Sequence, residues 1–182
     1  MKRQPNFQKL FFDHFNGPPK KVTYEVRQDS NRYHDLVFLS SLIHDARLKL
    51  SDVVRQKKQV SISINRDCWE LGIVKRNGIG ELYMANGKLT FSPAKSIQWH
   101  FQRKSKLDEE ELWIGGIWLN RPSRNDLRSL IIEGHGWDCE IILKDEDIRI
   151  VLEDIEVPYL YSQKEKSINK TLKRTRKRRR VA

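Results

Sequence analysis

The chain has 182 residues, of which 38% are hydrophobic and 9% aromatic, including five tryptophans. A chain of this length buries enough surface to fold without disulfides or metal ions, and its apolar content excludes a wholly disordered protein. The net charge of +11 is concentrated at the ends: residues 164–182 carry ten Lys or Arg and one Glu, and residues 1–21 carry five Lys or Arg and one Asp, which leaves residues 22–163 at −2.

Charge therefore divides the chain into three parts. We expect a basic aromatic N-terminal arm over residues 1–21, a globular β-rich domain over residues 22–163 and a disordered polybasic tail over residues 164–182, because blocks of like charge repel one another and commonly serve as interaction tails. The arm ends at Gly17-Pro18-Pro19, which breaks any helix. It is expected to pack its phenylalanines on the domain; the alternative is a segment that folds on a partner.

The domain begins with a strand and a helix. Residues 22–28 alternate between apolar and polar side chains, which predicts a strand with one buried face. Asp29-Ser30-Asn31 supplies turn and N-cap side chains, and apolar residues then recur at spacings of three and four. This periodicity predicts one helix over residues 33–47.

From residue 59 onward, short alternating or apolar runs predict strands separated by turn signals. Two of the signals, Asn77-Gly78-Ile79-Gly80 and Asn86-Gly87, contain the Asn-Gly dipeptide most typical of tight hairpin turns, because such turns need positive φ. Gly115-Gly116 inside one run predicts a bulge. The predicted strands cover residues 60–65, 69–74, 82–85, 89–91, 97–101, 112–119, 139–143 and 148–153.

Residues 127–132 fit either a helix or a strand. A capping-box pattern formed by Ser123 and Asp126 favours a helix, whereas the short length and the following Gly134-His135-Gly136 favour a hairpin, which is the preferred interpretation.

Eight or nine short strands with turn signals at roughly 8–12-residue spacing predict a mainly β (α+β) domain. We expect a single antiparallel β-sandwich or partly open barrel with one packed helix.

The tail holds the densest group of charges in the chain. Seven of its basic residues fall within eight consecutive positions, and such density neutralises phosphates and releases their counterions. Nucleic acid, including ribosomal RNA, is the favoured ligand; a nuclear-import signal, an anionic membrane, an acidic protein surface and a purely solubilising tail are the alternatives. The predicted nucleic-acid-binding residues are Lys173, Arg174, Arg176, Lys177, Arg178, Arg179 and Arg180.

The tryptophans have two interpretations. They fall in or beside predicted strands, so we expect them to fill the core, as aromatic residues commonly do in β domains. On an exposed sheet they would instead be stacking platforms for unpaired bases, although the slightly acidic domain argues against such a face. They are Trp69, Trp99, Trp113, Trp118 and Trp137.

No constellation of residues predicts an enzyme. His34-Asp35 and His44-Asp45 lie ten positions apart, whereas two ligands on one helix prefer a spacing of about four. Cys68, Cys139 and His135 lack the Cys-x-x-Cys or His-x-x-x-His pairs that anchor zinc. The acidic runs between strands are expected to be solvated turns. We therefore predict no catalytic residues, no metal and no cofactor.

The two cysteines are expected to be buried thiols, which indicates a reducing, cytoplasmic setting, or a nuclear one if the host is eukaryotic. No apolar run reaches the length of a signal peptide core or a transmembrane helix.

The leading hypothesis is a non-enzymatic nucleic-acid- or ribonucleoprotein-binding accessory protein that contacts nucleic acid or the ribosome through its tail. The alternative is a protein-interaction or assembly module whose sheet edge or N-terminal arm docks a protein partner.

Overall fold

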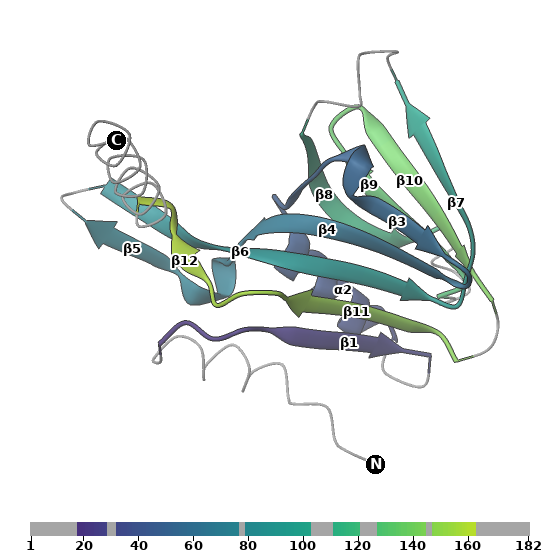
Figure 1. The fold of residues 1–182 in the computed structure, drawn as a ribbon, viewed down its shortest axis with the longest axis horizontal. Coiled ribbons are helices and arrows are strands. Elements are labelled where there is room, and N and C mark those ends of the chain that lie inside the picture. Colours follow the sequence, from purple (N-terminus) through teal and green to yellow (C-terminus); the bar gives the residue numbers. More distant parts are fainter. Residues whose placement is uncertain are drawn as a thin grey trace, which may run out of the picture.

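The computed structural model describes residues 18–28, 32–76, 79–102, 111–120, 127–144 and 147–162. Within these ranges the protein is mostly β with one helix, and its strands form one antiparallel sheet that does not close into a barrel (Figure 1). The prediction of a mainly β domain with one packed helix is confirmed, and the strands belong to one sheet instead of the two sheets of a sandwich. Most of the predicted N-terminal arm and the whole predicted tail lie outside the described residues.

The sheet contains twelve strands, and its main path runs β1-β11-β6-β4-β2-β8-β9-β10-β7, with β12 and β5 added to β6 and β3 added to β4. The elements are β1 (Thr23–Arg27), α2 (Arg32–Ile43), β2 (Arg47–Leu48), η1 (Leu50–Asp52), β3 (Val53–Gln56), β4 (Gln59–Asp67), η2 (Trp69–Leu71), β5 (Ile73–Arg76), β6 (Ile79–Ser92), β7 (Ala94–Phe101), β8 (Leu112–Leu119), β9 (Ser129–Gly134), β10 (Trp137–Leu143), β11 (Arg149–Asp154) and β12 (Tyr159–Leu160). The letter η marks a short 3₁₀ turn.

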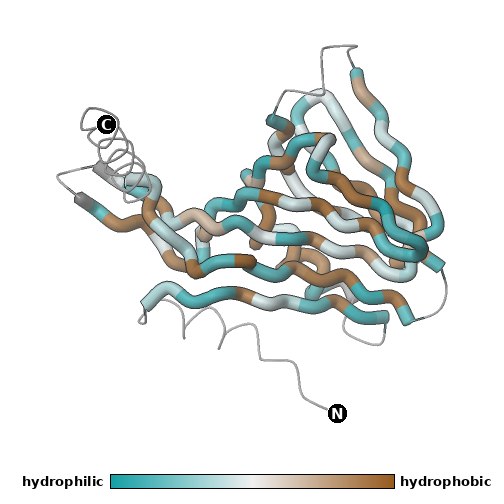
Figure 2. Tube along the Cα trace, viewed as in Figure 1, coloured by the Kyte–Doolittle hydropathy of each residue, from teal (hydrophilic) through white to brown (hydrophobic). Residues whose placement is uncertain are grey.

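The core lies between the inner face of the sheet and α2. Apolar residues alternate with polar ones along the strands, which is visible as alternating brown and teal segments in Figure 2. This period of two sends one set of side chains inward. Ile62, Leu89 and Ile150 are fully buried from three neighbouring strands, and Leu39 and Ile43 are fully buried from α2. The helix packs chiefly on β8, β1 and β4, so it fills the concave side of the curved sheet.

The Asn86-Gly87 turn prediction is wrong. β6 runs without a break from Ile79 to Ser92, and residues 87–91 pair with β4 on one side and β11 on the other. A Cβ on Gly87 would lie 3.4 Å from the Glu153 carbonyl oxygen and 3.5 Å from Asp154 Oδ1. The glycine therefore permits close packing of β6 on the end of β11, and pairing along both edges outweighs the local turn preference.

Two other predicted elements have different bounds. The helix predicted over 33–47 ends at Ile43, because Asp45 adopts a left-handed φ of 63° and residues 47–48 become β2. The strand predicted over 69–74 is instead the 3₁₀ turn η2 followed by β5. β5 and β6 pair across the turn predicted at 77–80, but Ile79 and Gly80 already belong to β6, and residues 77–78 lie outside the described ranges.

The predictions for the second half of the sheet are confirmed. Residues 129–134 form a strand that pairs with β10, as the hairpin interpretation requires. The register of β8 shifts between Ile114 and Gly116, which is the predicted bulge. The Ile117 N–H beside this bulge donates to Ser40 Oγ of α2 at 3.0 Å. This hydrogen bond joins the bulged part of β8 to the helix.

Candidate nucleic-acid interface

The seven tail residues predicted to bind phosphate lie outside the described residues, so the prediction stays untested. The structure fixes the point from which the tail continues. Ser162 is the last described residue, and its backbone N–H and its hydroxyl both donate to the Glu81 carboxylate, at 2.6 and 2.9 Å. Residues 163–182 therefore continue from the β12 side of β6.

A second group of basic side chains gathers on the folded domain itself. It lies at one end of the sheet, where the β3–β4 turn, the start of β7 and the end of β10 meet (Figure 1). We call it the basic corner; its members, all exposed, are Arg55, Lys57, Lys58, Lys95 and Lys144. Within the described residues, no ion pair joins any of the five to a carboxylate.

Three hydrogen bonds bring these separate segments together. The N–H that opens β7 donates to the Lys58 carbonyl at 2.6 Å. The Arg55 Nη2 donates to the Lys95 carbonyl at 2.8 Å, across the gap between the edge strands β3 and β7. The Lys144 N–H donates to the Pro93 carbonyl at 2.9 Å. The segments that carry the five charges are thus brought together by contacts between strand ends.

A polar track leads from the basic corner toward the middle of the outer face of the sheet. Near this end, the buried apolar residues of β4 and β6 lie on the inner face of the sheet, so the residues between them lie on the opposite face. On that face Ser61 is buried, whereas Ser63 and Lys88 are exposed. The cross-strand pairs of the track are Ser61–Thr90, Ser63–Lys88 and Asn65–Asn86. None of these six residues is acidic, which distinguishes the track from the slightly acidic average of the domain.

A cavity of about 190 Å³ opens at the end of the polar track. Both β2 and β3 pair with the same edge of β4, β3 up to Ile62 and β2 at Asn65, which leaves a fork between them. We call this cavity the fork cavity. Its lining includes Arg47, Lys49, Asp52, Ser63, Asn65 and Glu111. It combines cationic, anionic, hydroxyl and amide groups within one small volume.

Arg47 forms one wall of the fork cavity and is held from two sides. Its Nη2 donates to Asp67 Oδ1 at 2.9 Å, and its guanidinium carbon lies 5.1 Å from the ring centroid of Trp113, its cross-strand partner in β8. Burial raises the pKa of Asp67, and the positive charge of Arg47 opposes this shift. Among the described residues, the buried Nε of Arg47 has no hydrogen-bond partner. The guanidinium is therefore held in place with a donor still to satisfy.

The five tryptophans divide between core and surface. Trp137 is buried, and the ring centroid of Trp99 lies 5.4 Å from that of Trp137, as expected for core residues. Trp69, Trp113 and Trp118 are 42%, 49% and 42% exposed. The expectation that tryptophans fill the core is wrong for these three, and the exposed faces of Trp113 and Trp118 belong to β8 on the outer side of the sheet.

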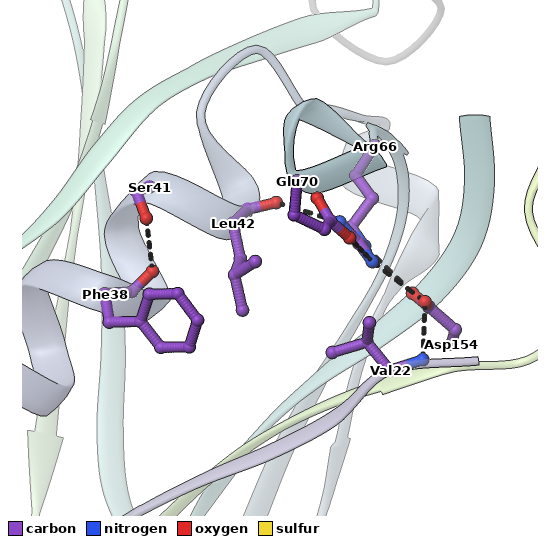
Figure 3. A network of polar contacts seen from close by, with 7 residues as sticks. All are labelled: Val22, Phe38, Ser41, Leu42, Arg66, Glu70 and Asp154. Carbon is purple, nitrogen blue, oxygen red and sulfur yellow. Dashed lines mark hydrogen bonds and ion pairs between the residues drawn. The ribbon is translucent and has the colours of Figure 1, made fainter. Parts of the chain in front are cut away.

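A buried charge network lies on the opposite, inner side. Arg66 is fully buried and donates to both oxygens of Asp154, at 2.9 and 2.8 Å, and to Glu70 at 2.7 Å; Asp154 also accepts the Val22 N–H (Figure 3). Burial alone would lower the pKa of Arg66, but its bonds to Asp154 and the charge of Glu70 raise it above its usual value. The network is enclosed and joins β4, η2, β11 and the start of β1, so we assign it a structural role.

The two cysteines are free, fully buried thiols, as the sequence predicts. Burial raises the pKa of both, that of Cys139 to about 12, so little reactive thiolate exists near neutral pH. Cys139 shares its buried face of β10 with Ile141 and Leu143. In the part of the chain that the structure describes, no group of three or more His, Cys, Asp or Glu side chains is placed to hold a metal ion.

Among the described residues, no helix has the length and apolar character needed to cross a membrane. Comparisons with protein-family models, curated proteins and solved structures found nothing that matches this chain.

Proposed function

We propose that this protein is a non-enzymatic nucleic-acid- or ribonucleoprotein-binding accessory protein, in which the C-terminal tail and the basic corner both contact phosphates. The observation that carries the proposal is the pairing of two separate cationic clusters. One cluster is the seven Lys and Arg side chains of residues 173–180. The other is the basic corner, whose five charges have no carboxylate partner among the described residues.

The charge distribution supports a polyanionic ligand over a small anion. Each lysine or arginine that neutralises a phosphate releases condensed counterions, and this gain grows with the number of phosphates contacted. Residues 22–163 are slightly acidic as a whole, at −2, so a polyanion is repelled from most of the domain and attracted to the basic corner. The domain would then give the bound strand a defined position, while the tail supplies most of the affinity.

The test is binding across a salt series to a single-stranded RNA and a DNA duplex of about 20 nucleotides. If all seven clustered tail charges pair with phosphates, removal of residues 164–182 should reduce the slope of log K against log[salt] by about 5 to 6. The double variant Lys57→Gln/Lys58→Gln removes two charges from the basic corner. It should reduce the slope by a further 1.4 to 1.8, roughly.

A matched control keeps the same change in net charge. Lys20 and Lys75 are exposed lysines outside the basic corner, and Lys20→Gln/Lys75→Gln should leave the slope of the full-length protein nearly unchanged. Equal changes in this slope for the two double variants would show that the basic corner makes no specific contact with the phosphates. An absence of binding by the full-length protein at low salt would overturn the proposed function itself.

A protein-interaction module remains the second candidate, and the projecting end of the sheet favours it. β5, β12 and the first half of β6 extend beyond the domain, toward the left in Figure 1. In or beside this extension, Ile73, Val157 and Tyr161 are 61%, 53% and 54% exposed, which is unusual for large side chains with apolar surface. This function would give a stoichiometric protein complex that survives both nuclease treatment and removal of residues 164–182.

A further inference from the structure

The fork cavity lies beside the polar track. Asn65, in the lining of the cavity, is six positions along β4 from Gln59, which adjoins Lys58 of the basic corner, and six steps correspond to about 20 Å of strand. We propose that the fork cavity binds an unpaired nucleobase, which stacks on the Arg47 guanidinium. The inference rests on the proposed function, because the phosphates of the same strand are held at the basic corner. It adds a preference for single-stranded over duplex ligands.

The stacking surface is already assembled. Arg47 lies over the Trp113 ring and is fixed by Asp67, so a base entering the fork cavity meets a guanidinium that does not need to be ordered first. Bases in single-stranded RNA commonly stack on arginine planes and aromatic rings. A base would therefore extend an existing aromatic–cation stack.

The charges around the cavity select a base over a phosphate. Asp52 and Glu111 line the cavity together with Lys49 and Arg47, so a phosphate would face two carboxylates at close range. A base is neutral and carries both donors and acceptors on its edge. Ser63 and the carboxylates can accept from its amino groups, and Lys49 can donate to its ring nitrogens and carbonyls.

The polar track links the two contacts. Its serine, threonine and asparagine side chains carry hydroxyl and amide groups, and its single charge, Lys88, is positive. A single strand can cross the exposed part of this surface, at Ser63 and Lys88, with its phosphates toward the basic corner and one base turned into the cavity. A duplex keeps its bases stacked and paired, so it can use the basic corner but not the fork cavity.

The experiment compares three probes of the same length on the full chain: a single-stranded RNA, the matching duplex, and a single strand without bases. Trp113→Ala removes the ring beneath Arg47, and Ser63→Phe fills the cavity from an exposed position on its floor. Each variant should weaken binding of the single-stranded RNA by roughly 5- to 150-fold, the range for loss of one stacked base. Binding of the duplex and of the base-free strand should stay within about two-fold.

Trp118→Ala is the matched control, because Trp118 lies on the same strand and the same face as Trp113 with similar exposure, 42% against 49%. It should leave binding of the single-stranded RNA unchanged. Salt-sensitive binding with no difference between the single-stranded RNA and the base-free strand would overturn the base site and keep the proposed function. Equal effects of Trp113→Ala and Trp118→Ala would also overturn the base site. No binding of any probe at low salt would overturn both.

Discussion

Lys57 stands at the tip of the β3–β4 hairpin with a φ of 48°, in the left-handed region. For a residue with a full side chain this conformation costs roughly 1–2 kcal/mol, and glycine and asparagine adopt it far more readily. The hairpin nevertheless carries lysine at this position and at Lys58. A residue that breaks a local preference is a reason to look for a function, and here the side chain supplies a charge to the basic corner.

Replacing this lysine separates its two effects. Lys57→Asn should raise the free energy of unfolding by up to about 1 kcal/mol, because asparagine tolerates the left-handed conformation. It should also make the salt slope of nucleic-acid binding shallower by about 0.7 to 0.9, because one phosphate contact is lost. Urea denaturation and a binding titration measure the two quantities.

Lys57→Gln is the control for that prediction, since it removes the charge without relieving the backbone. It should match Lys57→Asn in binding and the original protein in stability. Unchanged binding in both variants would mean that the lysine serves no phosphate contact.

At the scale of elements, periodicity predicted most strands because each buries one face. The Asn86-Gly87 turn failed for a reason that a local pattern does not contain: β6 has hydrogen-bonded neighbours on both edges, so continuing as a strand satisfies more backbone groups than turning. The helix prediction failed at its end in a related way. Ala46 is fully buried and continues the apolar spacing, but the backbone has already left the helix at Ile43.

The buried Arg66 network could not have been predicted from sequence, because its two carboxylate partners come from η2 and from the end of β11. Arg66→Ala should reduce the free energy of unfolding by about 3 to 5 kcal/mol, since it leaves two carboxylates in the interior without their cation. Denaturant unfolding followed by far-UV circular dichroism measures this change, and the native signal before the transition shows that the variant folds.

Arg149→Ala provides the comparison, because Arg149 also pairs across strands, with Glu25, but its side chain is 47% exposed. Its loss should reduce stability by less than about 1 kcal/mol. A similar loss for both arginines would show that burial does not determine the contribution of the Arg66 network.

At the scale of the whole molecule, the two parts of the candidate interface differ in how far sequence reveals them. The tail is visible as a run of charge in one segment. The basic corner draws on β3, the β3–β4 turn, β7 and the residue after β10, and the even balance of charge over residues 22–163 hides it. The adjacent Lys57-Lys58 pair at a turn was its one local signal. The fork cavity depends on two strands sharing one edge of β4, which only the fold shows.

The anchoring of Ser162 to Glu81 has a consequence for the size of the ligand. Glu81 and the start of β7 lie at opposite ends of β6, and the eleven steps along the strand from Glu81 to Ser92 correspond to about 36 Å of strand length. The tail thus begins about a strand length from the basic corner, and its seven clustered charges follow after residues 163–172. Under the proposed function, the protein would be a two-site tether. Once one site is occupied, binding at the other becomes intramolecular and is governed by effective concentration.

Affinity should therefore rise in a step with oligonucleotide length. Strands too short to reach both sites engage one site at a time, whereas strands that reach both gain roughly 10²- to 10⁴-fold in affinity. Residues 1–163 alone should show no step in the same length series. A smooth rise for the full chain would mean that the two sites act on different molecules, in which case the protein would join two strands instead of holding one.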